Sequence, residues 1–133
     1  MAWALAARSS CPRAAVGVVV TTWDGFVLST GYNGSPSGTA HCSEVGCLMD
    51  DDHCVRSVHA EMNAIITAGR HGVSLQGSTV YVTIRPCIRC LIALVQAGVA
   101  KVVFDDEYLG ARGDLADRSG MLSQIELIQR GTR

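Results

Sequence analysis

The stretch "STVYVTIRPCIRCLIALVQAGVAKVVFD", residues 78–105, decides the fold class of this chain. Its first seven residues are rich in β-formers, and its last six, "AKVVFD", are a second such run. The segment between them predicts a helix, with Pro86 in its first turn and Gly98 after its end. A strand, a helix and a second strand in this order indicate two parallel strands joined by a right-handed crossover.

Further elements extend this unit in both directions. Two β-rich runs, residues 15–22 and 26–32, flank Asp24-Gly25, which is typical of an antiparallel hairpin. The remaining predicted elements are a short helix over 2–9, a helix over 59–70 ended by Gly72, a weaker helix in 113–122 and a last strand in 123–129. Residues 33–57 show no period and are expected to be an irregular loop. The predicted fold is an α/β/α sandwich of three layers around a mixed sheet of about five strands.

Length and composition limit the class of protein. A chain of 133 residues predicts one domain, residues 1–133, and 48% apolar with 17% charged residues is typical of a folded globule. No apolar run has the length of a membrane span. The first positive charge, Arg8, follows the apolar opening rather than preceding it, which argues against a secretory signal and predicts a cytoplasmic protein. The net charge of −1, without a long basic block, makes nucleic acid an unlikely partner.

Two short motifs predict a metal site. Cys87 and Cys90 lie three residues apart at a helix start, so both sulfurs can bind one ion. Taken alone, this pair could also be redox-active or half of a zinc ribbon, but no second Cys-x-x-Cys exists in the chain. His59, at the start of the other predicted helix, supplies a third ligand. Three protein ligands and an open position are typical of catalytic rather than structural zinc.

Glu61 gives this predicted site its chemistry. Zinc with an open position lowers the pKa of a bound water to roughly 7, which provides hydroxide at neutral pH. A carboxylate beside it that is not a ligand can carry a proton from that water to a leaving nitrogen. His59-Ala60-Glu61 followed by Pro86-Cys87-x-x-Cys90 is the signature of zinc-dependent nucleobase deaminases. The predicted reaction is therefore hydrolytic deamination, with Glu61 as the proton shuttle.

Several longer segments resemble the deoxycytidylate (dCMP) deaminase family, including the similar deaminase of the bacterial late competence operon. They are "GYNGSPSG", "HCSEVGCLMDDDHC", "VHAEMNAI", "YVTIRPCIRC" and "QAGVAKVVF", and the resemblance runs from about residue 7 to residue 108. It implies a zinc enzyme of pyrimidine nucleotide metabolism that converts dCMP to dUMP by attack of hydroxide at C4. It also implies a homo-oligomer, often a hexamer, that is regulated by dCTP and dTTP.

The resemblance also implies roles for single residues. The zinc ligands would be His59, Cys87 and Cys90, with Glu61 as the shuttle. In the binding site, Ala60 would offer its backbone N–H to the base carbonyl, Asn33 would contact the sugar, Tyr108 would line the pocket, and Arg70 would serve a phosphate or an effector. Asn33 could instead be a simple turn residue, and Arg70 a cation that favours a helix end. Arg85 and Arg89 could be phosphate contacts or solvated charges.

The other cysteines predict a second metal. A structural zinc held by four of Cys11, Cys42, Cys47, His53 and Cys54 would order the long loop, and Cys11 would tie the N-terminal segment to it. The resemblance favours Cys11 and Cys42, then His53, and leaves Cys47 and Cys54 open. Inert buried cysteines are the alternative.

Other functions share parts of the pattern. A tRNA adenosine deaminase and a free cytidine or guanine deaminase carry the same core motifs. A zinc-stabilised structural or nucleic-acid-binding module is the non-enzymatic alternative. The open coordination position argues against that last alternative, since a structural site would close it.

Overall fold

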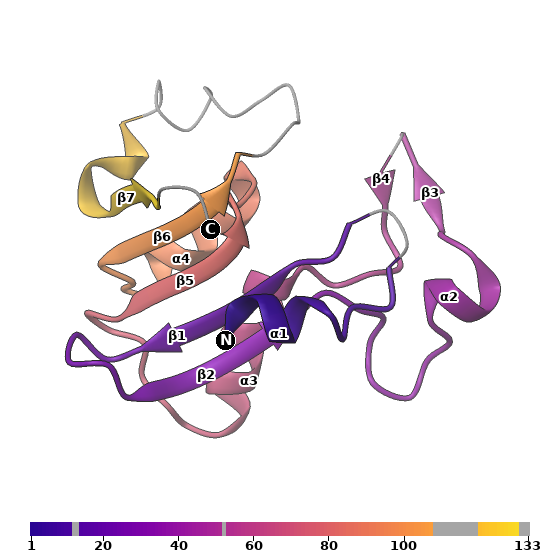
Figure 1. The fold of residues 1–133 in the computed structure, drawn as a ribbon, viewed down its shortest axis with the longest axis horizontal. Coiled ribbons are helices and arrows are strands. Elements are labelled where there is room, and N and C mark those ends of the chain that lie inside the picture. Colours follow the sequence, from indigo (N-terminus) through magenta and orange to yellow (C-terminus); the bar gives the residue numbers. More distant parts are fainter. Residues whose placement is uncertain (12–13, 52, 108–119, 131–133) are drawn as a thin grey trace.

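The computed structural model describes residues 1–11, 14–51, 53–107 and 120–130. One mixed sheet forms its centre, in the strand order β2-β1-β5-β6-β7 (Figure 1). The strands are β1 (Gly17–Thr21), β2 (Val27–Tyr32), β5 (Thr79–Ile84), β6 (Lys101–Asp106) and β7 (Glu126–Gln129). β1 pairs antiparallel with β2 and β5, whereas β5, β6 and β7 run parallel. The predicted hairpin and crossover are thus both confirmed.

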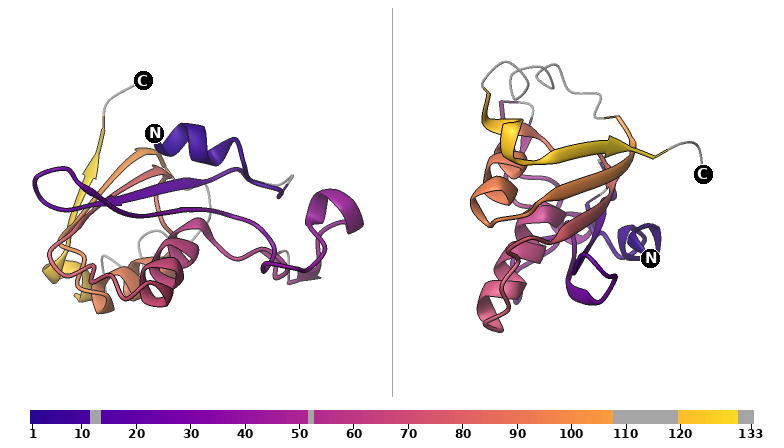
Figure 2. Two further views of the ribbon diagram at one scale, coloured as in Figure 1. Left: turned by 90° about the horizontal axis from the view of Figure 1, so that it is seen from below. Right: turned by 90° about the vertical axis from the view of Figure 1, so that its left-hand side faces the viewer.

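Helices cover both faces of this sheet. α3 (Ala60–Arg70) and α4 (Ile88–Gln96) lie on one face, and the short α1 (Ala2–Ala6) lies on the other (Figure 2). The 3₁₀ helix η1 (Met121–Gln124) contacts α4. Most of the weaker helix predicted over 113–122 lies outside the described residues. No helix within the described ranges has the length and apolarity needed to cross a bilayer.

α3 and α4 end just before the glycines that were expected to terminate them, but the start of α4 differs from the prediction. Gly72 and Gly98 have φ values of +68° and +87°, a conformation that favours glycine after a helix. α4 begins at Ile88, so Pro86 precedes the N-cap residue Cys87 instead of lying in the first turn. The backbone of Cys87 is extended, with φ −66° and ψ 165°, so the helix begins two residues after Pro86.

Residues 33–57 contain more structure than the sequence predicts. They include α2 (Cys42–Val45) and a small hairpin of β3 (Met49–Asp50) and β4 (His53–Cys54). These elements project away from the main sheet as an arm (Figure 1). The prediction of irregular chain was wrong here because elements of two to four residues are too short to produce a hydrophobic period.

The core lies between the sheet and the pair α3 and α4. Small side chains of α3 let the helix approach the valines of the sheet closely, and the largely inaccessible residues are Val18, Val20, Ala60, Ala64, Ala68, Val80, Val82, Leu94, Val102 and Phe104. This packing fixes the height of α3 above the sheet, and therefore the position of its first turn.

Gly31 marks the closest approach of β2 to α3. A Cβ atom at this position would lie 2.3 Å from the Ala60 carbonyl oxygen and 2.8 Å from the Ala64 nitrogen. Both atoms belong to the helix backbone, so they cannot move aside as a flexible side chain could. Only glycine therefore lets the first turns of α3 rest on β2.

We expect Gly31→Ala to destabilise the protein by about 1–3 kcal/mol, the usual cost of overpacking a filled site. Gly69→Ala is the control, because Gly69 lies in α3, the helix that Gly31 packs against, with open space around its Cβ position. That variant should be as stable as the wild type or slightly more stable, since alanine favours a helix. Urea unfolding of both variants measures the difference. Equal stability of Gly31→Ala and the wild type would contradict the steric argument.

Candidate metal centre

His59 lies just outside α3, as its N-cap residue. Its backbone is extended, with φ −62° and ψ 147°, while the helix proper begins at Ala60. N-cap side chains usually accept a hydrogen bond from the first turn, but His59 makes no such bond. The imidazole is therefore free to bind a metal ion in front of the first turn of the helix. Because His59 is not helical, it and Glu61 can approach the same point although they are two residues apart.

Cys87 has the corresponding position in α4. It is the N-cap residue of that helix, also without a side-chain cap bond, and Cys90 follows in the first turn. Of the three side chains, Cys90 is buried, Cys87 is half-buried and His59 is exposed. Both helices thus begin at this cluster, and their positive N-terminal ends favour the negative charge of thiolates there.

The distances in the cluster fit a tetrahedral zinc ion. His59 Nδ1 lies 3.6 Å from Cys87 Sγ and 3.4 Å from Cys90 Sγ. All three atoms lie within 4.8 Å of one another. Zinc bonds of about 2.0 Å to nitrogen and about 2.3 Å to sulfur, at tetrahedral angles, separate the two atoms by about 3.5 Å. The three predicted ligands are therefore placed as zinc requires.

The pKa values of the three side chains in this cluster are shifted in different directions. The hydrogen bond from Cys90 lowers the pKa of Cys87 to about 4, against the opposing effect of burial, and His59 adds to the lowering. The same bond and burial raise the pKa of Cys90. The bond to Cys87 also raises the pKa of His59. Zinc binds cysteine as the thiolate, so we expect metal binding to displace the proton of Cys90.

Glu61 is the buried carboxyl group of this site. Its side chain lies in the first turn of α3, and the residue is only 4% exposed. Burial raises its pKa, although its own backbone N–H and Cys90 act in the opposite direction. A raised pKa makes a carboxylate a better proton acceptor, which is a property that a proton shuttle needs.

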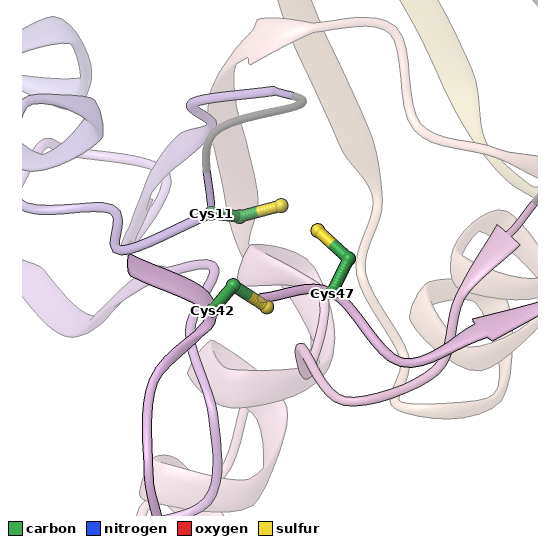
Figure 3. A group of neighbouring side chains, drawn as sticks. All are labelled: Cys11, Cys42 and Cys47. Carbon is green, nitrogen blue, oxygen red and sulfur yellow. The ribbon is translucent and has the colours of Figure 1, made fainter. Parts of the chain in front are cut away.

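A second cluster lies where the N-terminal segment meets the arm. The sulfurs of Cys11, Cys42 and Cys47 lie within 4.8 Å of one another (Figure 3). Cys54 lies next to this group, with its Sγ 3.6 Å from Cys42 Sγ. Two sulfurs on one tetrahedral zinc are separated by about 3.8 Å. The side chain of His53, the fifth predicted candidate, lies outside the described residues.

Charge is unevenly distributed in this second cluster too. Burial, followed by hydrogen bonds with Cys54 and Cys47, raises the pKa of Cys42 to about 12. Burial also raises the pKa of Cys54, but backbone N–H donors from Arg56 and Ser57 outweigh it and lower the pKa to about 6. Such donors stabilise a thiolate, the form of cysteine that binds metals.

A hydrogen bond of 2.9 Å between Ser10 Oγ and His41 Nδ1 also holds the N-terminal segment against the arm. Sequence reasoning missed Ser10, because nothing in a lone serine indicates a partner 31 residues away.

The predicted substrate-binding residues differ in how the structure describes them. The Asn33 side chain accepts a hydrogen bond from the Val16 N–H (2.9 Å) and donates one to the Ala14 carbonyl (2.7 Å). Ala60 is the first helical residue of α3, so its N–H has no partner within the helix. Tyr108 lies outside the described residues.

The arginines near the site differ in their surroundings. Arg85 lies over the Phe104 ring, 5.7 Å from its centre, and pairs with Glu107 at 3.7 Å. Arg89 is exposed on the first turn of α4, beside Cys90. Arg70 ends α3, about 15 Å along the helix from Ala60 by the rise of 1.5 Å per residue. Of these three arginines, Arg89 is the one that is both next to a cluster residue and exposed.

Comparison with known proteins agrees with this geometry. The family described as "cytidine and deoxycytidylate deaminase zinc-binding region" matches residues 1–105. The chain belongs to this family. The description of the family names zinc as the metal, and the first cluster of this chain offers ligand atoms that fit zinc.

Individual relatives carry more specific names. The chain is 47% identical over 104 residues to ComE operon protein 2 of Bacillus subtilis, covering 78% of this chain and 54% of that protein. It is 37% identical over 109 residues to the deoxycytidylate deaminase of Saccharomyces cerevisiae, covering 77% and 34%. The chain thus spans about half, or less, of these relatives. A dCMP deaminase of the cyanophage S-TIM5, solved with dCMP and dUMP, superposes with a TM-score of 0.81 at 30% identity, over 97% of this chain and 90% of that one.

Proposed function

We propose that this protein is a dCMP deaminase, which converts dCMP and water to dUMP and ammonia. The observation that carries the proposal is Glu61, a buried carboxyl group beside three metal-ligand atoms at zinc-like distances. The similarity to the S-TIM5 enzyme over nearly the whole chain supports the choice of dCMP among related bases. Cytosine loses its C4 amino group in this reaction and gains a carbonyl oxygen from water.

In this proposal His59 Nδ1 and the sulfurs of Cys87 and Cys90 hold zinc. Zinc, when bound, makes water acidic enough to supply hydroxide at neutral pH. Glu61 accepts the proton that this water loses and delivers it to the C4 amino nitrogen, which leaves as ammonia. Burial of Glu61 keeps bulk water from competing for that proton. The backbone N–H of Ala60 donates to the base carbonyl.

Sugar and phosphate would be bound around this centre. Asn33 already binds backbone through its amide, but its carbonyl oxygen and NH₂ group can each make one further bond, in this case to the sugar. Arg89 is our candidate for the phosphate, since Arg85 is held by Phe104 and Glu107. Tyr108 as a pocket residue and Arg70 as an effector contact remain predictions from the resemblance.

The second cluster would hold a structural zinc. We propose Cys11, Cys42, Cys47 and Cys54 as its ligands, because the first three sulfurs form one group and the Cys54 sulfur lies 3.6 Å from that of Cys42. Four protein ligands close the coordination sphere, as is usual for structural zinc. Homo-oligomer formation, regulation by dCTP and dTTP, and a cytoplasmic location remain predictions.

The phosphate should matter strongly for turnover. A charge-assisted hydrogen bond to phosphate contributes about 1.5–3 kcal/mol. We therefore expect kcat/KM for dCMP to exceed that for deoxycytidine by about 10- to 100-fold. Ammonia release from dCMP, deoxycytidine, guanine and tRNA measures this directly. Equal efficiency on dCMP and deoxycytidine would contradict the nucleotide proposal, and turnover of tRNA would favour the adenosine deaminase alternative.

Arg89→Ala tests the phosphate contact separately. This variant should lose efficiency on dCMP while its efficiency on deoxycytidine stays unchanged, because the nucleoside has no phosphate for Arg89 to bind. A parallel loss on both substrates would instead assign Arg89 to the stability of α4.

A further inference from the structure

Asn63 connects the start of α3 to the end of β2. Its side-chain Nδ2 donates a hydrogen bond of 2.9 Å to the Tyr32 carbonyl oxygen. β2 is one of the two edge strands of the sheet in the described part of the chain. The bond from the Asn33 N–H to the Val16 carbonyl makes 16 and 33 a hydrogen-bonded pair, so the adjacent pair of Gly17 and Tyr32 is a non-hydrogen-bonded one. The Tyr32 carbonyl therefore points away from β1, and Asn63 satisfies it.

A second connection lies just before the metal ligand. Gly34 and Val58 form an isolated antiparallel bridge, with N–H···O distances of 3.2 Å and 2.8 Å. Residues 32–34 are thus bound to Val58 on one side of the His59–Glu61 turn and to Asn63 on the other. These two connections and the chain from Val58 to Asn63 form a closed ring with residues 32–34. The turn that carries His59 and Glu61 is part of this ring.

The segment that anchors this ring is itself fixed. The Asn33 side chain binds the backbone of Ala14 and Val16, and the Asn33 N–H donates to the Val16 carbonyl at 3.4 Å. Residues 32–34 are therefore held to the chain that leads into β1, a strand that lies between β2 and β5 in the sheet. A fixed segment can transmit the position of the sheet to the turn, which a flexible loop could not.

We infer that Asn63 is a positioning residue, which holds Glu61 and His59 at their working distance from each other. The inference rests on the proposed function for what that distance is needed for. Asn63 reaches the Tyr32 carbonyl rather than the metal cluster, so it acts through the turn. A side chain of the same size without an N–H donor leaves the carbonyl unsatisfied and frees one end of the ring. Displacements of about 1 Å at a reacting group can lower a rate about 100-fold.

The test compares Asn63→Leu with Ser29→Ala. Ser29 Oγ donates to the Ala64 carbonyl at 2.7 Å, so it joins the same strand to the same helix, one residue further from the metal end. Asn63→Leu should lower kcat for dCMP about 10- to 100-fold and change KM less than threefold. Asn63→Gln, which keeps a donor, should recover part of kcat. Ser29→Ala should lose stability without a specific loss of kcat.

A second readout does not depend on turnover. With cadmium in place of zinc, cadmium NMR distinguishes a site with two sulfur ligands from one with four. Asn63→Leu should shift or broaden only the resonance of the site with two sulfurs, and Ser29→Ala should change neither. If Asn63→Leu, like Ser29→Ala, changed neither this resonance nor kcat, the positioning role would be overturned. A wild type without dCMP deaminase activity would refute the proposed function, while the NMR comparison would still decide the role of Asn63.

Discussion

Glu61→Ala should fold and bind metal as the wild type does but lose nearly all turnover of dCMP. Glu61 is not among the three ligand atoms, so its removal leaves the imidazole and both sulfurs in place. General acid–base catalysis contributes about 10²- to 10⁴-fold, and here one carboxyl group serves both proton transfers. We therefore expect kcat to fall by about 10³-fold or more. Steady-state ammonia release, with metal analysis of the same sample, measures both parts of this prediction.

Glu126→Ala is the control for the loss of a carboxylate. Glu126 is exposed at the start of β7, on the strand at the far edge of the sheet from β2. Its replacement should leave both kcat and metal content unchanged. If Glu61→Ala kept a tenth of the wild-type rate, Glu61 could not be the proton shuttle. If it lost the zinc, the carboxylate would have to be reassigned as a ligand.

Cys42→Ser should remove the second metal and loosen the arm. Cys42 is 4% exposed, belongs to the three-cysteine cluster and lies 3.6 Å from Cys54 Sγ. Metal binding is worth about 10–16 kcal/mol to zinc-finger peptides, and short elements such as α2, β3 and β4 have little else to order them. Elemental analysis should find about two zinc ions per wild-type chain and about one per variant chain. The melting temperature should fall.

The effect on catalysis should be indirect. The two ends of the arm, Gly34 and Val58, pair with each other directly before the His59–Glu61 turn. Loss of the second metal should therefore raise KM for dCMP more than it lowers kcat. A wild type with one zinc ion, together with an unchanged melting temperature in Cys42→Ser, would make the additional cysteines packing residues.

Two further variants identify the fourth ligand. Cys54→Ser should lose one metal ion per chain, because the Cys54 sulfur adjoins Cys42 and accepts backbone hydrogen bonds that stabilise its thiolate. His53→Ala should keep both ions. The reverse result would assign the fourth position to His53, the choice that the family resemblance favours over Cys54.

Local patterns predict much of the fold and bring together the residues of the candidate metal site. Runs such as 78–84 and 100–105 have a β-propensity that does not depend on distant contacts, so strands are predictable there, and β5 and β6 form at these runs. The short elements of the arm are not predictable in this way, because two paired residues leave no period in a sequence. The start of α4 differs from the prediction because the backbone of Cys87 is extended, which the position of Pro86 does not indicate.

The sequence by itself determined the chemistry of this protein. His59, Glu61, Cys87 and Cys90 are residue types whose donors and acceptors suit zinc and proton transfer in any fold that gathers them. Only the tertiary structure decided how they gather. The approach of β2 to α3 at Gly31 and the bond from Asn63 to the Tyr32 carbonyl both join segments that are about 30 residues apart in the sequence. The contact of Arg85 with the Phe104 ring, which leaves Arg89 as the exposed arginine, also joins separate elements. Contacts of this kind leave no local signal, because their free energy comes from packing and hydrogen bonding between elements that meet only in the folded chain.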